Sequence, residues 1–171
     1  MKSPAKKPKP TARQWARVKL FAMDVDGILT DGSLFISSDG TETKIFNILD
    51  GSGLVQLRAA GITTAWISGR KSDATTVRAN ALKIPHVFQG SNDKLGILRQ
   101  LAAQLKLTPS EIVYMGDDDI DAPAIAWAAI GATVPTAMPP ALAAASIITK
   151  RPAGGGAVRE ICDHILAARA K

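Results

Sequence analysis

The chain has 171 residues, of which 46% are hydrophobic and 21% are charged, and its net charge is +6. This composition is typical of a globular protein with a substantial core. The sequence contains no run of 18 apolar residues, so it predicts no membrane-spanning helix. The single cysteine, Cys162, excludes an internal disulfide and a cysteine-rich metal site. We expect Cys162 to be a small buried hydrophobe and the protein to be cytoplasmic.

The positive charge is concentrated at the N-terminus. Residues 1–19 contain seven basic residues and no acidic residue, so the other 152 residues have a net charge of −1. We expect residues 1–17 to be a basic, disordered tail and residues 18–171 to form a single domain. No apolar stretch follows the first lysines, so the tail does not resemble a secretory signal. A solvated tail without a specific partner is favoured over a nucleic-acid-binding arm, because the near-neutral body offers no extended basic surface.

The first predicted strand ends in two acidic residues. Residues 20–23 are apolar and precede Asp24-Val25-Asp26-Gly27. If the chain stays extended, Asp24 and Asp26 point the same way and can share a site, where two close carboxylates need a cation. A calcium loop of the helix-loop-helix kind is disfavoured, because Ile28 and Leu29 stand where further ligands would follow. A plain surface turn fits poorly with the apolar residues on both sides.

Further along the chain, strands alternate with helices. Residues 33–47 predict a β-hairpin, because Asp39-Gly40 separates two β-prone runs. The other predicted elements, in order, are a short helix from residue 54 that ends at Gly61, a strand at 62–67, a helix at 72–82, a strand at 86–88, a helix at 92–105, a strand at 111–115, a helix at 124–129, strands at 130–134 and 146–148, and a helix at 158–168. This order predicts an α/β fold with a Rossmann-like parallel sheet, helices on both faces and the hairpin as an insertion.

Four polar clusters each follow a predicted strand. They are Asp24 with Asp26, then Ser68-Gly69-Arg70, then Lys94, and finally Asp117, Asp118 and Asp121 after Gly116. Each cluster alone has an ordinary explanation, such as a turn, a solvated lysine or a helix cap. Together they are expected to meet at the carboxyl edge of the sheet, where ligands bind in such folds.

These residue types suit phosphoryl transfer, which depends on positioning and charge neutralisation. We expect Asp24 to be a nucleophile that forms an aspartyl-phosphate, and Asp26 to donate and later accept a proton. Lys94 and Mg²⁺ would neutralise charge, Ser68 and backbone N–H groups would hold phosphate oxygens, and Asp117 would complete the metal site. Asp121 would orient Lys94 or a metal-bound water.

Taken together, these motifs resemble those of a known family. The order DxDG, Ser-Gly, Lys and GDDxxD is similar to that of haloacid dehalogenase superfamily phosphatases. Further matches resemble the 3-deoxy-D-manno-octulosonate 8-phosphate phosphatase group: Phe46-Asn47, Asp50-Gly51, Gln89-Gly90 and the block 156–160. The resemblance implies a small enzyme without a cap domain that works as a homotetramer, in which hairpins 33–47 pair and neighbouring chains help close each site.

The resemblance also assigns residues. It implies that Asp24, the Asp26 backbone carbonyl and Asp117 bind Mg²⁺. It places Asn47, Asp50, Gly51, Gly69, Arg70, Arg78 and Lys94 where the family contacts phosphate or the sugar acid.

The chain departs from the family where the substrate is recognised. Leu49 stands where the family typically has Arg, and Val55 and Gly155 stand where basic residues are common. An Arg that binds a carboxylate through two hydrogen bonds is not replaced by Leu. We therefore expect a sugar-acid phosphatase, with 3-deoxy-D-manno-octulosonate 8-phosphate as the leading substrate. The alternatives are another sugar phosphate such as a nonulosonate 9-phosphate, a non-catalytic sugar-phosphate-binding relative, and a nucleic-acid-binding protein that acts through its tail.

Overall fold

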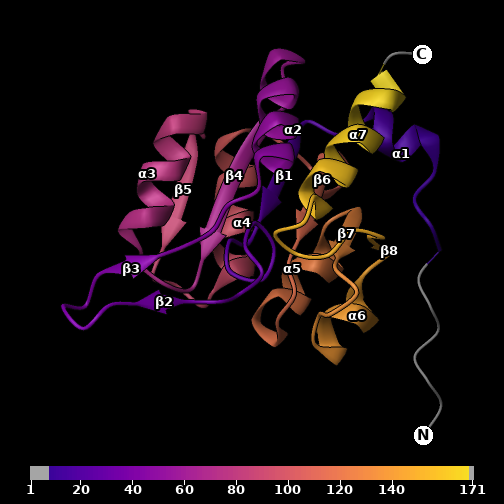
Figure 1. The fold of residues 1–171 in the computed structure, drawn as a ribbon. Coiled ribbons are helices and arrows are strands. Elements are labelled where there is room, and N and C mark those ends of the chain that lie inside the picture. The colour runs from indigo at the N-terminus through magenta and orange to yellow at the C-terminus, as the bar shows by residue number, and fades with distance from the viewer. Residues whose placement is uncertain (1–7, 170–171) are drawn as a thin grey trace, which may run out of the picture.

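The computed structural model describes residues 8–169, and its centre is a six-stranded parallel sheet (Figure 1). The strand order is β5-β4-β1-β6-β7-β8, and all paired neighbours run parallel. The strands are β1 (Leu20–Met23), β4 (Thr63–Ser68), β5 (His86–Gln89), β6 (Ile112–Met115), β7 (Ile130–Thr133) and β8 (Ile147–Ile148). This confirms the predicted α/β fold with a parallel sheet.

The central strands are buried along their whole length. Every residue of β1, β6 and β7 is buried, as is typical of parallel strands that are covered on both faces. Phe21, Trp66 and Tyr114 are among the largest fully buried side chains. The apolar runs in the sequence therefore predict these strands well.

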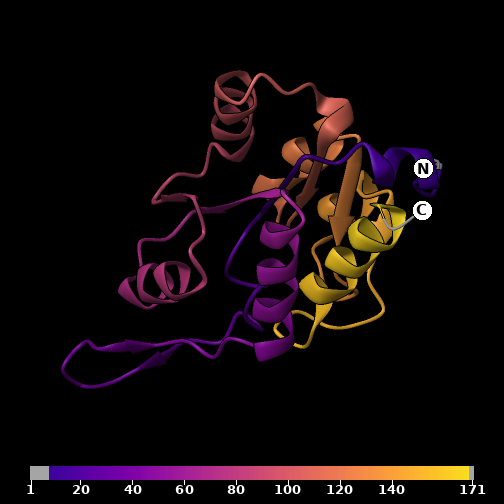
Figure 2. The same ribbon diagram turned by 90° about the horizontal axis from the view of Figure 1, so that it is seen from above.

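Helices cover both faces of the sheet, as expected from right-handed crossovers (Figure 2). α2 (Ile48–Ala59) and α7 (Ala157–Arg169) lie side by side on one face, with α3 (Asp73–Leu82) beside α2. α4 (Lys94–Gln104) and α5 (Ala122–Trp127) lie on the other face. The sequence patterns did not predict α6 (Pro139–Ala144) or the two single 3₁₀ turns at Pro109–Glu111 and Asp119–Asp121.

The predicted hairpin is present and projects from the body of the molecule (Figure 2). Its strands are β2 (Phe35–Ile36) and β3 (Glu42–Thr43), which pair antiparallel. Gly40 has a φ of +85°, and the Thr41 N–H donates to the Asp39 carboxylate at 2.9 Å. The Asp-Gly turn signal therefore located the hairpin correctly, although the strands are much shorter than the 33–47 segment.

The structure differs from the expected 1–17 tail over residues 11–17. α1 (Ala12–Ala16) is capped by Thr11, which forms reciprocal hydrogen bonds with Gln14. Trp15 is buried, and its ring stacks on that of His164 in α7 at 5.1 Å between centroids. Burial of this large aromatic side chain orders a segment whose composition looks disordered. Residues 8–10 form no helix or strand, and residues 1–7 of the predicted tail lie outside the described residues.

Helix α2 begins six residues earlier than expected, at Ile48. The glycines at 51 and 53 are poor helix formers, and the sequence therefore suggested a loop there. A Cβ atom at position 53 would lie 3.0 Å from the Cys162 Sγ atom, so Gly53 allows α2 and α7 to pack closely. Cys162 is buried, which confirms that expectation. Within residues 8–169, no helix is long and apolar enough to cross a bilayer.

Candidate active site

The first and last polar clusters meet at the point where the strand order reverses. From β1 the chain builds β4 and β5 on one side, and then crosses over to build β6, β7 and β8 on the other. Asp24 follows β1 and Asp117 follows β6, and the Asp24 N–H donates to the Met115 carbonyl at 2.9 Å. The crevice beyond the strands at such a switch point is the usual ligand site of an open α/β sheet.

Lys94 is buried at the centre of this cluster. It is the first residue of α4, whose N-cap is Asp93, and its side chain has no exposed surface. Its ammonium lies 2.7 Å from Asp24 Oδ1 and 3.8 Å from Asp121 Oδ1, and it donates to the Ile67 carbonyl. A buried ammonium needs such partners, so Lys94 ties the ends of β1 and β4 to the loop after β6.

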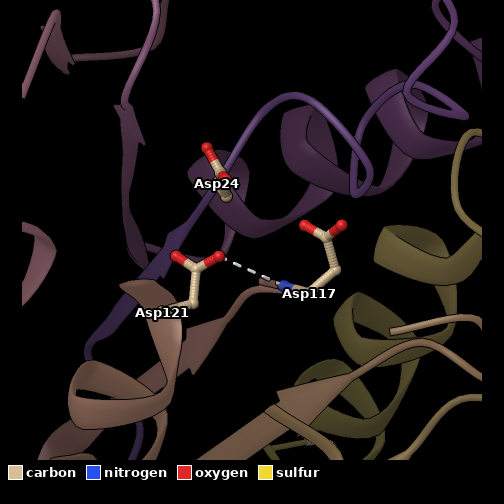
Figure 3. Close-up of side chains that lie close together, drawn as sticks. All are labelled: Asp24, Asp117 and Asp121. Carbon is tan, nitrogen blue, oxygen red and sulfur yellow. Dashed lines mark hydrogen bonds between the residues drawn. The ribbon is translucent and has the colours of Figure 1, made fainter. Parts of the chain in front are cut away.

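Hydrogen bonds fix the carboxylate of Asp121, which lies close to Asp24 and Asp117 (Figure 3). One of its oxygens accepts from the Tyr114 hydroxyl at 2.6 Å, and the other accepts from the N–H groups of Asp117 and Asp118 at 3.2 Å. A Cβ atom on Gly116 would lie 2.3 Å from Asp121 Cγ, so only glycine permits this close approach. Asp121 therefore fixes the loop that carries Asp117.

Asp117 has a free buried oxygen. Its Oδ1 atom is buried and has no hydrogen-bond partner among residues 8–169, and a Cβ atom at position 27 would lie 2.2 Å from its Oδ2 atom. Gly27 has a φ of +84°, so glycine is required there both for the turn and for the space. Carboxylate oxygens of Asp24, Asp117 and Asp121 lie within 4.8 Å of one another. An unpaired buried oxygen in such a cluster fits a hard divalent cation.

The electrostatics also favour a cation. Burial, together with the negative charge of Asp121, raises the pKa of Asp24 to about 7 despite the opposing effect of Lys94. Burial and the charges of Asp24 and Asp121 likewise raise the pKa of Asp117 to about 7. The positive charge of Lys94 alone therefore does not neutralise the negative charge of the three carboxylates.

Asp26 is not part of this carboxylate cluster. The sequence argument for a shared site assumed an extended chain, but the chain turns at Val25, whose carbonyl accepts from the N–H groups of residues 28–30. The Asp26 carboxylate instead pairs with Lys44 of the hairpin segment, 2.5 Å away. Two lysines thus hold the two acids separately.

The Ser68-Gly69-Arg70 segment follows β4, as predicted. Ser68 is buried, and its hydroxyl accepts from the Arg70 N–H at 3.2 Å. Gly69 allows the Asn92 side-chain oxygen to approach its Cα, where a Cβ atom would lie only 2.8 Å away. The Arg70 guanidinium donates to Glu42 of β3 at 2.6 Å, so the hairpin contacts a predicted substrate-binding residue.

Four other predicted substrate-binding residues lie around the start of α2, where each makes contacts within the chain. Asn47 caps α2 and donates to the Gly154 carbonyl at 3.1 Å. Asp50 is buried and accepts from the backbone N–H groups of Gly156 and Arg159 at the start of α7. Gly51 makes room for Arg78, whose guanidinium lies 6.0 Å above the Phe46 ring.

Asp118, which we expected to support the site, caps the 3₁₀ turn at 119–121.

Sequence reasoning missed Lys44 and Tyr114. Lys44 lies in a hairpin that carried no polar motif, and its partner Asp26 is 18 residues away. Tyr114 looks like one more apolar residue of a buried strand. The available signal was the general rule that a buried tyrosine hydroxyl needs a partner, which here is Asp121.

Comparison with known proteins agrees with this geometry. The model of the haloacid dehalogenase-like hydrolases matches residues 42–161, and the chain belongs to this family. This confirms the family predicted from the motifs.

Individual relatives show which enzymes of this family the chain is similar to. The chain is 40% identical over 156 residues to 3-deoxy-D-manno-octulosonate 8-phosphate phosphatase of Yersinia pestis, covering 91% of this chain and 83% of the relative. It is 36% identical over 154 residues to the phosphatase of the same name from Escherichia coli K12, covering 90% and 82%. The crystal structure of the Moraxella catarrhalis phosphatase, in complex with magnesium ion, phosphate ion and KDO, is 43% identical. It superposes with a TM-score of 0.91 over 93% of this chain and 91% of that chain.

Proposed function

We propose that this protein is a Mg²⁺-dependent phosphomonoesterase that hydrolyses 3-deoxy-D-manno-octulosonate 8-phosphate. The observation that carries the proposal is the Asp24–Lys94 pair at the switch point, 2.7 Å apart and beside the unpartnered oxygen of Asp117. The choice of substrate is supported by sequence identities of 36 to 43% to 3-deoxy-D-manno-octulosonate 8-phosphate phosphatases.

Asp24, Asp117 and the backbone carbonyl of Asp26 would hold the Mg²⁺ ion. The free Asp117 oxygen and the raised pKa values of the two carboxylates support this set. When bound, Mg²⁺ would neutralise charge on the phosphoryl group and on the carboxylates. Asp121 is excluded from our set because both its oxygens already accept hydrogen bonds.

The reaction has two steps. In the first, a carboxylate oxygen of Asp24 attacks phosphorus, the bond from phosphorus to the sugar oxygen breaks, and Asp26 gives its proton to that oxygen. In the second, water attacks phosphorus, Asp26 takes a proton from the water, and the bond to Asp24 breaks to release phosphate. Lys94 orients Asp24 and offsets the negative charge that accumulates when an anion attacks an anion.

Residues at the end of β4 and around the start of α2 lie where they can contact the substrate or support those contacts. Ser68, Gly69 and Arg70 stand at the end of β4 beside Lys94, and we assign them to phosphate and sugar-acid binding. We assign Asn47, Asp50, Gly51 and Arg78 a supporting role, because their contacts join α2 to the 154–159 segment and to Phe46.

Two apolar side chains of α2 bear on the choice between sugar-acid substrates. Leu49 and Val55 are 43% and 39% exposed, so two apolar side chains occupy positions where basic residues are common in the family. This observation favours testing a nonulosonate 9-phosphate as the second candidate.

The experiment is a phosphate-release assay with both sugar-acid phosphates and glucose 6-phosphate, in Mg²⁺ and in EDTA. We expect the octulosonate ester to have the highest kcat/KM by at least about 10-fold, and the matched variant Asp24→Asn to release none. A higher kcat/KM for the nonulosonate ester would transfer the assignment to it. No phosphate release from any ester would support a non-catalytic binding protein.

We further propose a homotetramer built through the 33–47 hairpin. Phe35, Ile36, Ile45 and Ile48 are 53%, 66%, 64% and 81% exposed, and among residues 8–169 β2 and β3 pair only with each other. A projecting two-stranded ribbon with exposed apolar side chains and open edges suits pairing with other copies. The cytoplasmic location and the absence of a nucleic-acid partner stay predictions.

A further inference from the structure

A second buried lysine lies beside the proposed proton donor. The Lys44 side chain has no exposed surface, although it comes from the hairpin segment that projects from the body. Its ammonium lies 2.5 Å from Asp26 Oδ1, 3.5 Å from the Thr75 hydroxyl and 3.7 Å from Glu42 Oε1. Burying an ammonium is costly unless it is paired, so the position of Lys44 depends on Asp26 and Glu42.

The two oxygens of Asp26 have different surroundings. Oδ1 accepts from Lys44, whereas Oδ2 is buried and has no hydrogen-bond partner in the described part of the chain. A carboxylate with one oxygen fixed can rotate little about its last torsion angle. The pairing with Lys44 therefore restricts where the unpaired Oδ2 atom can lie.

We infer that Lys44 is a positioning residue for the reaction, which fixes Oδ1 of Asp26 so that Oδ2 exchanges the proton with the leaving oxygen and with water. This inference rests on the proposed phosphatase function. In the first step the proton moves from Oδ2 to the sugar oxygen as the phosphorus–oxygen bond breaks. In the second step Oδ2 takes a proton from the attacking water, so Asp26 returns to its starting state and Lys44 keeps its proton throughout.

The hairpin anchors this lysine on the body of the protein. Glu42 of β3 accepts from the Arg70 guanidinium at 2.6 Å and from the Ser72 hydroxyl at 2.7 Å. Positive and negative groups thus alternate from Arg70 through Glu42 and Lys44 to Asp26. The hairpin therefore contributes to the site through its charged face, in addition to its exposed apolar side chains.

The test compares two kinds of leaving group. A sugar phosphate releases an alkoxide that needs a proton, whereas p-nitrophenyl phosphate releases a stable phenolate that does not. The readout is kcat/KM, which reports the first step alone, because hydrolysis of the aspartyl-phosphate is common to both esters and enters only kcat. General acid catalysis contributes about 10²- to 10⁴-fold, so we expect Lys44→Met to lower kcat/KM for the sugar phosphate by about 100-fold. We expect less than about a threefold loss of kcat/KM for p-nitrophenyl phosphate, and Lys44→Arg should recover part of the lost kcat/KM because it can still donate to Oδ1.

A double-variant cycle separates positioning from a structural role. If Lys44 acts through Asp26, Lys44→Met should have no further effect on kcat/KM in the Asp26→Asn background. The exposed Lys71 supplies the control, since Lys71→Met makes the same chemical change near the site and should leave both activities unchanged.

The outcomes are distinguishable. Equal losses of kcat/KM for both esters, or a further loss in the Asp26→Asn background, would overturn the positioning role while leaving the phosphatase intact. An inactive wild-type protein would instead refute the proposed function. If Lys44→Met does not give a folded circular dichroism spectrum, the same comparison of kcat/KM is made with Lys44→Arg, for which equal losses with the two esters would again overturn the inference.

Discussion

Asp24 should destabilise the metal-free protein above neutral pH. Its pKa is 3.8 in the unfolded chain and about 7 in the folded one, mainly because of burial. Below pH 3.8 it is protonated in both states and has no effect. As pH rises from 3.8 to 7 the unfolded state ionises first, so the free energy of unfolding falls, and above pH 7 the loss stays constant.

The magnitude follows from this shift. About three pKa units correspond to about 4 kcal/mol at about 1.4 kcal/mol per unit. Asp24→Asn keeps the shape and removes the charge, and Lys94 keeps Asp121 and the Ile67 carbonyl as partners. In EDTA at pH 8 we therefore expect Asp24→Asn to be more stable than wild type by up to about 4 kcal/mol, and by only about 2 kcal/mol at pH 5.

The assay is urea unfolding at equal protein concentration, at pH 5 and pH 8, in EDTA and in Mg²⁺. Mg²⁺ should stabilise wild type at pH 8 by about 1.4 kcal/mol per tenfold excess over its dissociation constant, and should stabilise Asp24→Asn much less. Asp163→Asn, an exposed carboxylate in α7, is the control and should change stability by less than about 1 kcal/mol. A variant less stable than wild type in EDTA at pH 8, or a difference that does not change with pH, would refute the reasoning.

Three further predictions concern geometry. Gly27→Ala should abolish Mg²⁺ binding measured by calorimetry, because the added Cβ would lie 2.2 Å from Asp117 Oδ2. The control is Gly40→Ala, which should bind Mg²⁺ normally because position 40 has a similar φ of +85° but open space around it. Equal affinities in the two variants would show that the space at position 27 does not matter. Ile36→Glu should dissociate the oligomer in light scattering, and a monomeric wild type would contradict the hairpin-mediated assembly. Asp50→Ala should lower the free energy of unfolding by about 2 to 4 kcal/mol, because two backbone N–H groups lose a charged acceptor; a change below about 0.5 kcal/mol in urea titration would show that this contact is not stabilising.

Much of the fold follows from local patterns. Residues 20–23 and 112–115 are continuous apolar runs followed by acids, and both are buried strands with the site at their ends. The start of α2 could not be predicted, because Gly51 and Gly53 disfavour a helix in isolation. They are accepted because α7 and Arg78 pack against them, and this is a contact between distant segments.

The order of motifs likewise predicted that Asp24, Lys94 and Asp117 meet, since the carboxyl ends of parallel strands share an edge. What the sequence by itself determined is the strand–acid pattern, and with it the family and the chemistry. Only the tertiary structure decided how the charges are partnered. Asp24 pairs with Lys94 across 70 residues and Asp26 with Lys44 across 18, while Asp50 of α2 caps α7 more than 100 residues later. The physical reason is that a buried charge takes whichever partner the packed chain brings within about 3 Å, and this distance depends on the whole fold.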